Sequence, residues 1–296
     1  SNAGNSISNL AGSAKAVTLI NNMALNISTV NTSGLTTSGD ISVTSTTSML
    51  DASGIWVKAP VQTTGGNITL LGTNAASAGI LTQGIGLRID ARLGGDSAGA
   101  ITLAGNSKLD AGISVGSGGA IRSKKLITMT GKGIIGLNLS GSVTSVAGGA
   151  DFAGSNAIAL KGESTSLSNP VGVLLAGGVT NNSTRGVMNI MSSLGSLFMD
   201  SGIFNADTAS DVMIFAGDGT TNSTAAISST ARAVVTQNAN ANVFITSDGQ
   251  GNVTPAKVVK SGTGAGDILV AAGKLIAAGD GSGGQVTAAS GNSITN

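Results

Sequence analysis

A short segment of alternating apolar and polar residues recurs along the whole chain. It reads GGNITLLG at residues 65–72, AGAITLAG at 98–105 and GAGDILVAAG at 264–273. The first apolar residue of each copy recurs at a mean interval of about 27 residues. These first residues are Val17, Ile41, Ile68, Ile101, Ile127, Ile158, Met188, Val212, Val243, Ile268 and Val286. Two residues further on, ten of the eleven copies again carry a large apolar side chain, which is the period-2 alternation of a β-strand.

A second, looser strand pattern lies between these segments. Examples are SMLDASGIWV at 48–57, GLRIDA at 86–91 and KLDAGISV at 108–115. A unit with only two or three short strands cannot bury its own apolar face, whereas stacked units bury it in a continuous core. Variable intervals between units then correspond to loops of variable length. We therefore predict an all-β fold, a parallel β-helix (β-solenoid) of about eleven coils of roughly 27 residues each.

Glycine and aromatic content separate this fold from its alternatives. The 46 glycines disfavour helices, because glycine is costly in a helix interior. Tandem β-sandwiches need repeats of about 100 residues. Propeller blades need about 40 residues with aromatic signatures, whereas aromatic residues are only 2% of this chain. We predict one β-helix domain over residues 4–296, an excerpt of a longer repetitive protein, after a cloning scar at residues 1–3.

Charge and residue content also narrow the functional classes. The formal net charge is +1 and the basic residues are scattered, which argues against a nucleic-acid binder. No apolar run approaches the roughly 18 residues of a membrane span, so we expect no membrane insertion. The chain has no His, no Cys and a single glutamate, Glu163, which leaves few groups for acid–base chemistry or for binding zinc. We expect no catalysis, no cofactor, no bound metal and a monomer.

GGNITLLG-type strands that alternate with LDASG-type strands, on a background without His or Cys, resemble the filamentous haemagglutinin type of large exoprotein. The similarity covers residues 14–291. Members of this family are bacterial adhesins of two-partner secretion systems, with long right-handed parallel β-helical shafts. Their N-terminal secretion domain carries NPNG- and NPNL-type motifs, whereas the only Asn-Pro pair here lies in NPVGV at 169–173. This departure indicates the central shaft region rather than the secretion domain.

The resemblance also implies a location and a set of partners. It implies a protein that is secreted or attached to the outer membrane at the bacterial cell surface. An outer-membrane transporter would be its partner during secretion, and a host-cell glycan or protein receptor would be its ligand. Two alternatives stay open: an autotransporter passenger domain, and a carbohydrate-active β-helix enzyme or polysaccharide-binding module.

The most charged segment, LRIDARLGGD at 87–96, is the first candidate ligand-binding site. It carries Arg88, Asp90, Arg92 and Asp96. Arg88, Asp90 and Arg92 alternate, so we expect them on one face of a strand. There they form either a sugar site or a self-satisfied surface trio of little energetic weight, which is the more common outcome. The enzyme alternative needs two carboxylates about 5 to 9 Å apart, and Asp90 and Asp96 are its candidates.

The residue that follows each first apolar residue should point outward from its coil. It is Thr or Ser in the first five copies and becomes apolar at Met213, Phe244 and Leu269. These three residues form either a partner-binding surface or an apolar strip covered by the insertion at 217–234, and we expect the second. Function should lie where the repeat is broken, in the 33-residue interval after Ile68 and at Phe244.

Overall fold

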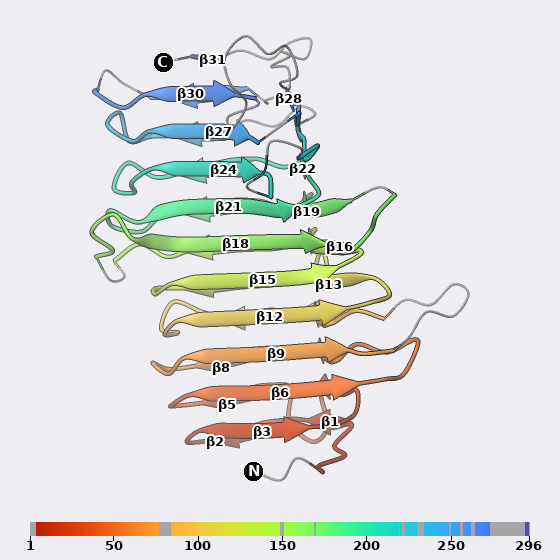
Figure 1. Ribbon diagram of the computed structural model, residues 1–296. Coiled ribbons are helices and arrows are strands. Elements are labelled where there is room, and N and C mark those ends of the chain that lie inside the picture. The colour runs from red at the N-terminus through yellow and green to blue at the C-terminus, as the bar shows by residue number, and fades with distance from the viewer. Residues whose placement is uncertain are drawn as a thin grey trace.

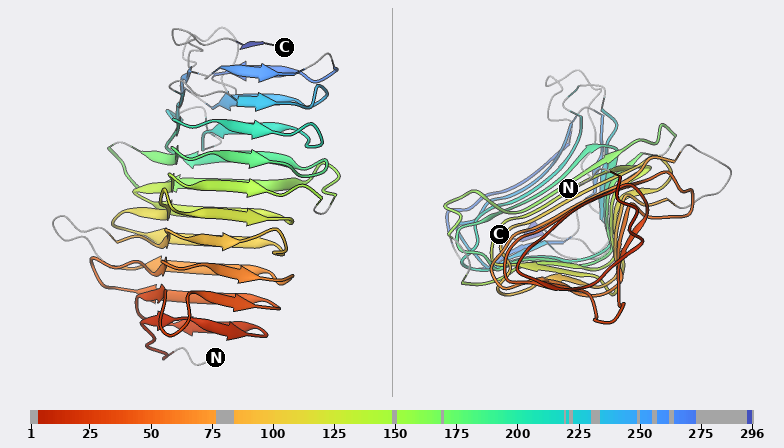
Figure 2. Two further views of the ribbon diagram at one scale, coloured as in Figure 1. Left: turned by 180° about the vertical axis from the view of Figure 1, so that it is seen from behind. Right: turned by 90° about the horizontal axis from the view of Figure 1, so that it is seen from below.

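The three-dimensional structure, a computed structural model, confirms the all-β parallel solenoid (Figure 1). It describes residues 4–76, 84–148, 151–168, 170–218, 220, 223–229, 234–248, 250–254, 257–261, 264–272 and 294–295. Within these ranges every regular element is a β-strand, and no helix is long and apolar enough to cross a membrane. The strands form three parallel sheets that enclose a triangular cross-section, with loops projecting from the corners (Figure 2).

The strands of each sheet stack in chain order. The first sheet contains β1 (Asn9–Leu10), β4 (Leu25–Ile27), β7 (Ile55–Val57), β10 (Leu87–Ile89), β13 (Ala111–Val115), β16 (Ile135–Leu139), β19 (Val171–Leu175), β22 (Ser196–Met199), β25 (Ile227–Ser229) and β28 (Val253–Thr254). The second contains β2 (Gly12–Ala14), β5 (Leu35–Thr37), β8 (Val61–Thr63), β11 (Arg92–Gly94), β14 (Ala120–Ser123), β17 (Ser142–Ser145), β20 (Val179–Asn181), β23 (Ile203–Asn205), β26 (Val234–Thr236), β29 (Val258–Lys260) and β31 (Ile294–Thr295). The third contains β3 (Val17–Asn21), β6 (Ile41–Thr47), β9 (Ile68–Asn74), β12 (Ile101–Ser107), β15 (Ile127–Gly133), β18 (Asn156–Ser164), β21 (Val187–Leu194), β24 (Val212–Ala216), β27 (Val243–Ser247) and β30 (Ile268–Ala271).

The third sheet is built from the recurring segment, in the predicted register. Val17 pairs with Ile41, Ile41 pairs with Ile68, and each later copy pairs with the next as far as Ile268. The eleventh copy, at Val286, lies outside the described residues. The described part of this sheet has ten strands, whose successive pairings make about nine turns, slightly fewer than the eleven coils predicted.

The looser sequence pattern forms the first sheet. The segments 48–57, 86–91 and 108–115 contain β7, β10 and β13. The sequence predicted two or three strands per coil, but it did not locate the strands of the second sheet. These strands have only two to four residues each. Such strands are too short to show an alternation in the sequence.

Inward side chains from the three sheets stack into one core. Isoleucines occupy the same position in consecutive coils from Ile41 to Ile158, and all are fully buried. Stacking of like on like lets β-branched and leucine side chains fill a core of constant width. The five Phe and the single Trp are all half-buried rather than part of this core. Bulky aromatic surface is therefore presented on the outside of the solenoid.

Glycines line the inside of the corner at which the chain passes from the third sheet to the first. Gly72, Gly105, Gly131 and Gly162 form one column in consecutive strands. A Cβ atom on Gly105 would collide with the carbonyl oxygen of Gly112, and the other three glycines face a carbonyl in or directly before a strand of the first sheet. The two backbones approach too closely here for any side chain, which explains a run of glycines at one strand position.

A column of buried polar side chains closes the second sheet at its corner with the third. Asn181 Nδ2 donates to Oδ1 of Asn205 at 3.0 Å, and Asn205 Nδ2 donates to Oγ1 of Thr236 at 3.2 Å. Ser145 Oγ donates to Oδ1 of Asn181 at 3.1 Å, and Asn181 Nδ2 also reaches the carbonyl of Gly186 at 2.8 Å. Because these buried groups find partners in neighbouring coils, they tie the coils together instead of destabilising them.

Candidate functional site

The charged segment 87–96 runs across the corner between the first and second sheets. Arg88 lies in β10 of the first sheet, whereas Arg92 begins β11 of the second. The expectation that Arg88, Asp90 and Arg92 share one face is therefore wrong, because the chain turns between the two strands. Asp90 stays with Arg88, whose Nε donates to Oδ2 of Asp90 at 2.8 Å.

Trp56 completes this cluster from the preceding coil. It pairs with Arg88 in the register of β7 and β10, and its Nε1 donates to Oδ2 of Asp90 at 2.7 Å. The guanidinium carbon of Arg88 lies 4.3 Å from the centre of the indole ring, and Nζ of Lys58 lies 3.7 Å from it. Both separations are within cation–π range. The sequence pattern did not reveal this cluster, because Trp56 and Asp90 are 34 residues apart.

Asp96 lies in the turn after β11, at the other end of that strand from Asp90. Its carboxylate accepts a hydrogen bond from Nε of Arg122, which belongs to β14 in the next coil. This bond holds the pKa of Asp96 below its usual value, and the charges of Arg122, Lys124 and Arg92 add to the effect against a desolvation cost. Asp90 and Asp96 thus have separate arginines and do not converge on one point.

A hollow of ≈ 470 Å³ opens beside Asp96 on the outside of the second sheet. We call it the basic hollow, and it is lined by Thr36, Gln62, Thr63, Thr64, Arg92, Gly94, Gly95, Asp96, Ser97 and Arg122. Gly94 has a φ of +81°, and a Cβ there would collide with the carbonyl oxygen of Arg122, so only glycine fits at this position. The hollow brings together Arg92 and Asp96 of the predicted site and adds Arg122. Arg88 and Asp90 are not among its lining residues.

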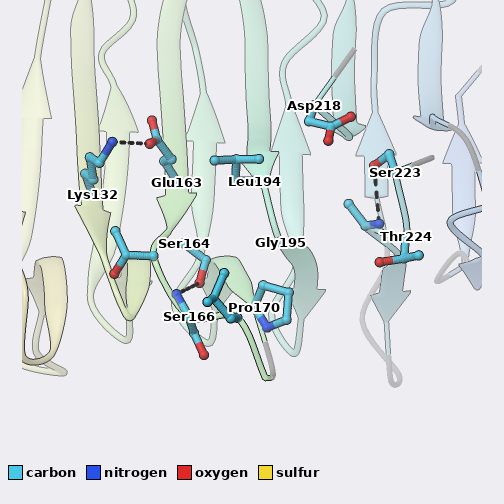
Figure 3. A pocket seen from close by; sticks show the side chains of 13 residues that line it. Lys132, Glu163, Ser164, Ser166, Pro170, Leu194, Gly195, Asp218, Ser223 and Thr224 are labelled. Atoms are coloured by element: carbon cyan, nitrogen blue, oxygen red, sulfur yellow. Dashed lines mark hydrogen bonds and ion pairs between the residues drawn. The ribbon is translucent and has the colours of Figure 1, made fainter. Parts of the chain in front are cut away.

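A second cavity, of ≈ 460 Å³, lies where the third sheet turns into the first (Figure 3). Lys132 and Glu163 face each other on the neighbouring strands β15 and β18 and form an ion pair beside it. Leu194 and Asp218 line it from later coils. A register shift after Gly162 places Glu163 opposite Leu194, so the repeat is locally broken here. This corner cavity was not predicted from the sequence, because its residues come from separate coils.

The outer face of the third sheet becomes apolar towards the C-terminal end of the solenoid. Met213, Phe244 and Leu269 are lateral neighbours on β24, β27 and β30. Met213 is 41% exposed, Leu269 is 45% exposed and Phe244 is half-buried. The expected cover by the segment 217–234 is wrong, since the described strand of that segment, β25, lies in the first sheet. The strip is therefore an exposed apolar surface.

A second column widens this apolar surface. Met191 and Phe215 are lateral neighbours on β21 and β24, and both are half-buried. Phe215 follows Met213 by two residues on one strand, so the two columns share a face. A groove of ≈ 220 Å³ adjoins Met191 and includes Lys161 among its lining residues.

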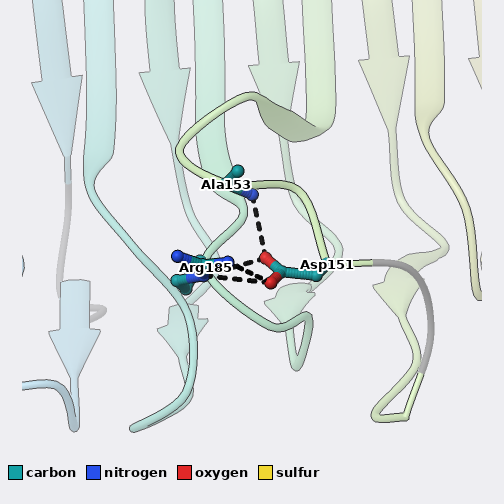
Figure 4. Close-up of polar contacts among 3 residues, drawn as sticks. All are labelled: Asp151, Ala153 and Arg185. Carbon is teal, nitrogen blue, oxygen red and sulfur yellow. Dashed lines mark hydrogen bonds and ion pairs between the residues drawn. The ribbon is translucent and has the colours of Figure 1, made fainter.

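An ion pair between two turns holds the corner of the second and third sheets (Figure 4). Nε of Arg185 lies 2.9 Å and 3.1 Å from the two carboxylate oxygens of Asp151, and Nη2 of Arg185 forms a further contact. The hydrogen bond from Arg185 lowers the pKa of Asp151, the backbone N–H of Ala153 lowers it further, and Asp151 in turn raises the pKa of Arg185. Both side chains are exposed, so this contact orders the loops rather than forming a binding site.

No protein-family model, no curated protein and no solved structure matches this chain. Its three parallel sheets, stacked coil upon coil, define a β-solenoid protein. A fold does not by itself specify a function, so the function has to be argued from the surfaces described above.

Proposed function

We propose that this chain is a structural and adhesive segment of a secreted or surface-attached bacterial adhesin of the filamentous haemagglutinin type. It projects binding surfaces away from the cell and attaches to host or surface ligands without catalysing a reaction. The observation that carries the proposal is the register of the third sheet, in which ten consecutive strands pair one after another. For the route of export, an autotransporter passenger domain is the alternative to two-partner secretion.

The bonding pattern supports the role of a rigid shaft. In all three sheets each inner strand pairs with strands of the coils before and after it, so backbone hydrogen bonds run along the axis of the solenoid. The buried apolar columns and the Asn181–Asn205 column add side-chain contacts between the same coils. A rod of this kind holds surfaces on different coils at a fixed spacing.

The charged side chains support binding rather than catalysis. The described residues form four ion pairs, in which each acid has its own basic partner: Arg88–Asp90, Arg122–Asp96, Lys132–Glu163 and Arg185–Asp151. The pKa shifts of Asp96 and Asp151 are downward, which keeps both carboxylates ionised at neutral pH. A general acid would need the opposite shift.

Adhesion of the isolated chain tests the proposal. Beads coated with the purified chain should attach to cultured host cells more strongly than beads coated with a heat-denatured copy, and free chain should compete. An antibody against the chain should also label intact bacteria that carry its gene. Attachment equal to that of the denatured control, together with no labelling of intact cells, would contradict the proposal.

A carbohydrate-active β-helix enzyme is the second candidate, and the corner cavity favours it. Glu163 and Asp218 both line that cavity, with Lys132 paired to Glu163 (Figure 3). Glycoside cleavage uses two carboxylates about 5 to 9.5 Å apart. Polysaccharides incubated with such an enzyme should release reducing ends, and Glu163→Gln should abolish the release. If the intact chain releases none from acidic or neutral polysaccharides, this candidate is wrong.

A further inference from the structure

We infer that the basic hollow on the second sheet binds the anionic groups of an acidic polysaccharide. The inference rests on the proposed adhesive function and names the class of ligand that one of its surfaces recognises. The ligand's charged group would lie between the guanidinium groups of Arg92 and Arg122, which are the hollow's two cationic lining residues. Guanidinium groups bind carboxylate and sulfate oxygens through paired N–H donors.

The hollow carries more positive charge than its own acid can neutralise. Arg92, Arg122 and Lys124 all lower the pKa of Asp96, so three cations surround one carboxylate. Only Arg122 forms an ion pair with Asp96, and among the described residues no carboxylate lies within ion-pair distance of Arg92. Arg92 is also exposed. It is therefore a cation that is free to accept an anion from solution.

The uncharged lining is suited to a sugar. Thr36, Gln62, Thr64 and Ser97 contribute hydroxyl and amide groups around the hollow. Each of these groups can both donate and accept hydrogen bonds, as sugar hydroxyl groups require. Gly95 adds open space to this lining, because a Cβ atom there would meet no other atom within 4 Å. Cations that flank a hydroxyl-rich hollow match a sugar that bears a carboxylate or a sulfate.

A nucleic acid fits this surface less well. Single-stranded nucleic acids are bound largely by aromatic side chains on which bases stack. The hollow has no aromatic lining residue. Trp56, on the strand that leads to β8, already has Lys58 and Arg88 against its ring and Asp90 on its Nε1. The indole ring is therefore already engaged by side chains of this chain.

The cations continue around the corner onto the first sheet. Arg88 and Lys58 lie on the coils that lead into β11 and β8, and Arg92 begins β11 itself. These three residues, together with Arg122 and Lys124, form a band of cations that crosses two sheets. Asp90 and Asp96 are the acids that pair with cations of this band among the described residues. A linear polyanion can contact several of these cations at once, so its binding should weaken as salt screens the charges.

Binding to immobilised polysaccharides tests the inference. The folded chain should bind polygalacturonate or dextran sulfate, should not bind neutral dextran, and should lose affinity as the salt concentration rises. Arg92→Glu should weaken binding at least tenfold. Lys161→Glu is the matched control, because it makes the same charge change at an exposed lysine of the third sheet and should leave affinity within about twofold. Circular dichroism is the check that both variants are folded. Arg92→Ala repeats the test with a milder change.

The outcomes separate this inference from the proposed function. Preference for polygalacturonate assigns the ligand group as a carboxylate, and preference for dextran sulfate assigns it as a sulfate; both support the inference. Equal weakening by Arg92→Glu and Lys161→Glu would overturn it, as would binding of single-stranded DNA as tight as that of the polysaccharide. If the chain attaches to cells but binds no acidic polysaccharide, the inference fails and the adhesive function stands. If it attaches to neither, both fail.

Discussion

Replacement of Ile127 by alanine perturbs the stacked core at its centre. Ile127 is fully buried in β15, and its lateral neighbours Ile101 and Ile158 are fully buried as well. The substitution therefore opens a cavity inside one column without touching the surface. The backbone hydrogen bonds on both sides hold the neighbouring coils in place, so the core can collapse only partly into the space.

The expected loss of stability follows from this burial. Alanine lacks about three carbon atoms of isoleucine, which at about 0.8 kcal/mol for each buried methylene gives about 2.4 kcal/mol. The unfilled cavity adds to this transfer cost, and buried Ile→Ala changes in well-packed cores cost about 2–5 kcal/mol. We expect Ile127→Ala to lower the free energy of unfolding by about 3 kcal/mol. The adjacent Thr128 points outward and is half-buried, so Thr128→Ala should cost less than about 1 kcal/mol.

Urea unfolding followed by two probes measures the effect. Far-UV circular dichroism reports the whole solenoid, and fluorescence of Trp56, the only tryptophan, reports the coil of β7. Because repeat proteins gain stability from neighbouring units, a weak central coil should also separate the two midpoints. Equal destabilisation by Ile127→Ala and Thr128→Ala, with coincident midpoints, would refute the alternation of inward and outward residues on which the fold rests.

Four further predictions concern other parts of the solenoid. Gly131→Ala should lower the thermal midpoint, with a cost of about 1–3 kcal/mol, because the added methyl group meets a carbonyl of the first sheet. Asn181→Ala should cost about 1–3 kcal/mol in urea unfolding, because it leaves buried polar groups in neighbouring coils without partners. Arg185→Ala should raise the pKa of Asp151 towards the usual value of an aspartate in an NMR titration. Because the folded pKa is depressed, this contact stabilises the fold above the unfolded pKa and loses its effect as pH falls through the folded pKa. Met213→Thr should reduce binding of an apolar dye and change stability by less than about 1 kcal/mol, because Met213 is on the outer face.

Each of these predictions has a contrary result. A stable Gly131→Ala protein would mean that the corner is wider than the structure shows, and a neutral Asn181→Ala would mean that the polar column contributes nothing. An Asp151 pKa that does not change in Arg185→Ala would remove the ion pair as its cause. Dye binding that is unchanged in Met213→Thr would place the exposed apolar surface elsewhere.

The candidate sites were only partly predictable from the sequence. The segment 87–96 drew attention because of its charge, and the structure places Arg92 and Asp96 beside one hollow. The partners of these residues could not be found in the same way, because Arg122 is 26 residues from Asp96 along the chain. The corner cavity went unpredicted for the same reason.

The sequence by itself determined the strand type, the coil length and the lateral register of the third sheet. A period-2 alternation states which side chains are buried, and a one-residue slip would turn every buried residue outward, so the register follows from the pattern alone. Only the tertiary structure decided where each coil turns, because the three-residue strand β11 carries too little alternation to mark a corner. The positions of these corners decide which side chains from different coils meet. They separate Arg88 from Arg92 and bring Asp90 to Trp56. They also leave the apolar strip at Phe244 without the cover expected from segment 217–234, because the described strand of that segment belongs to another sheet.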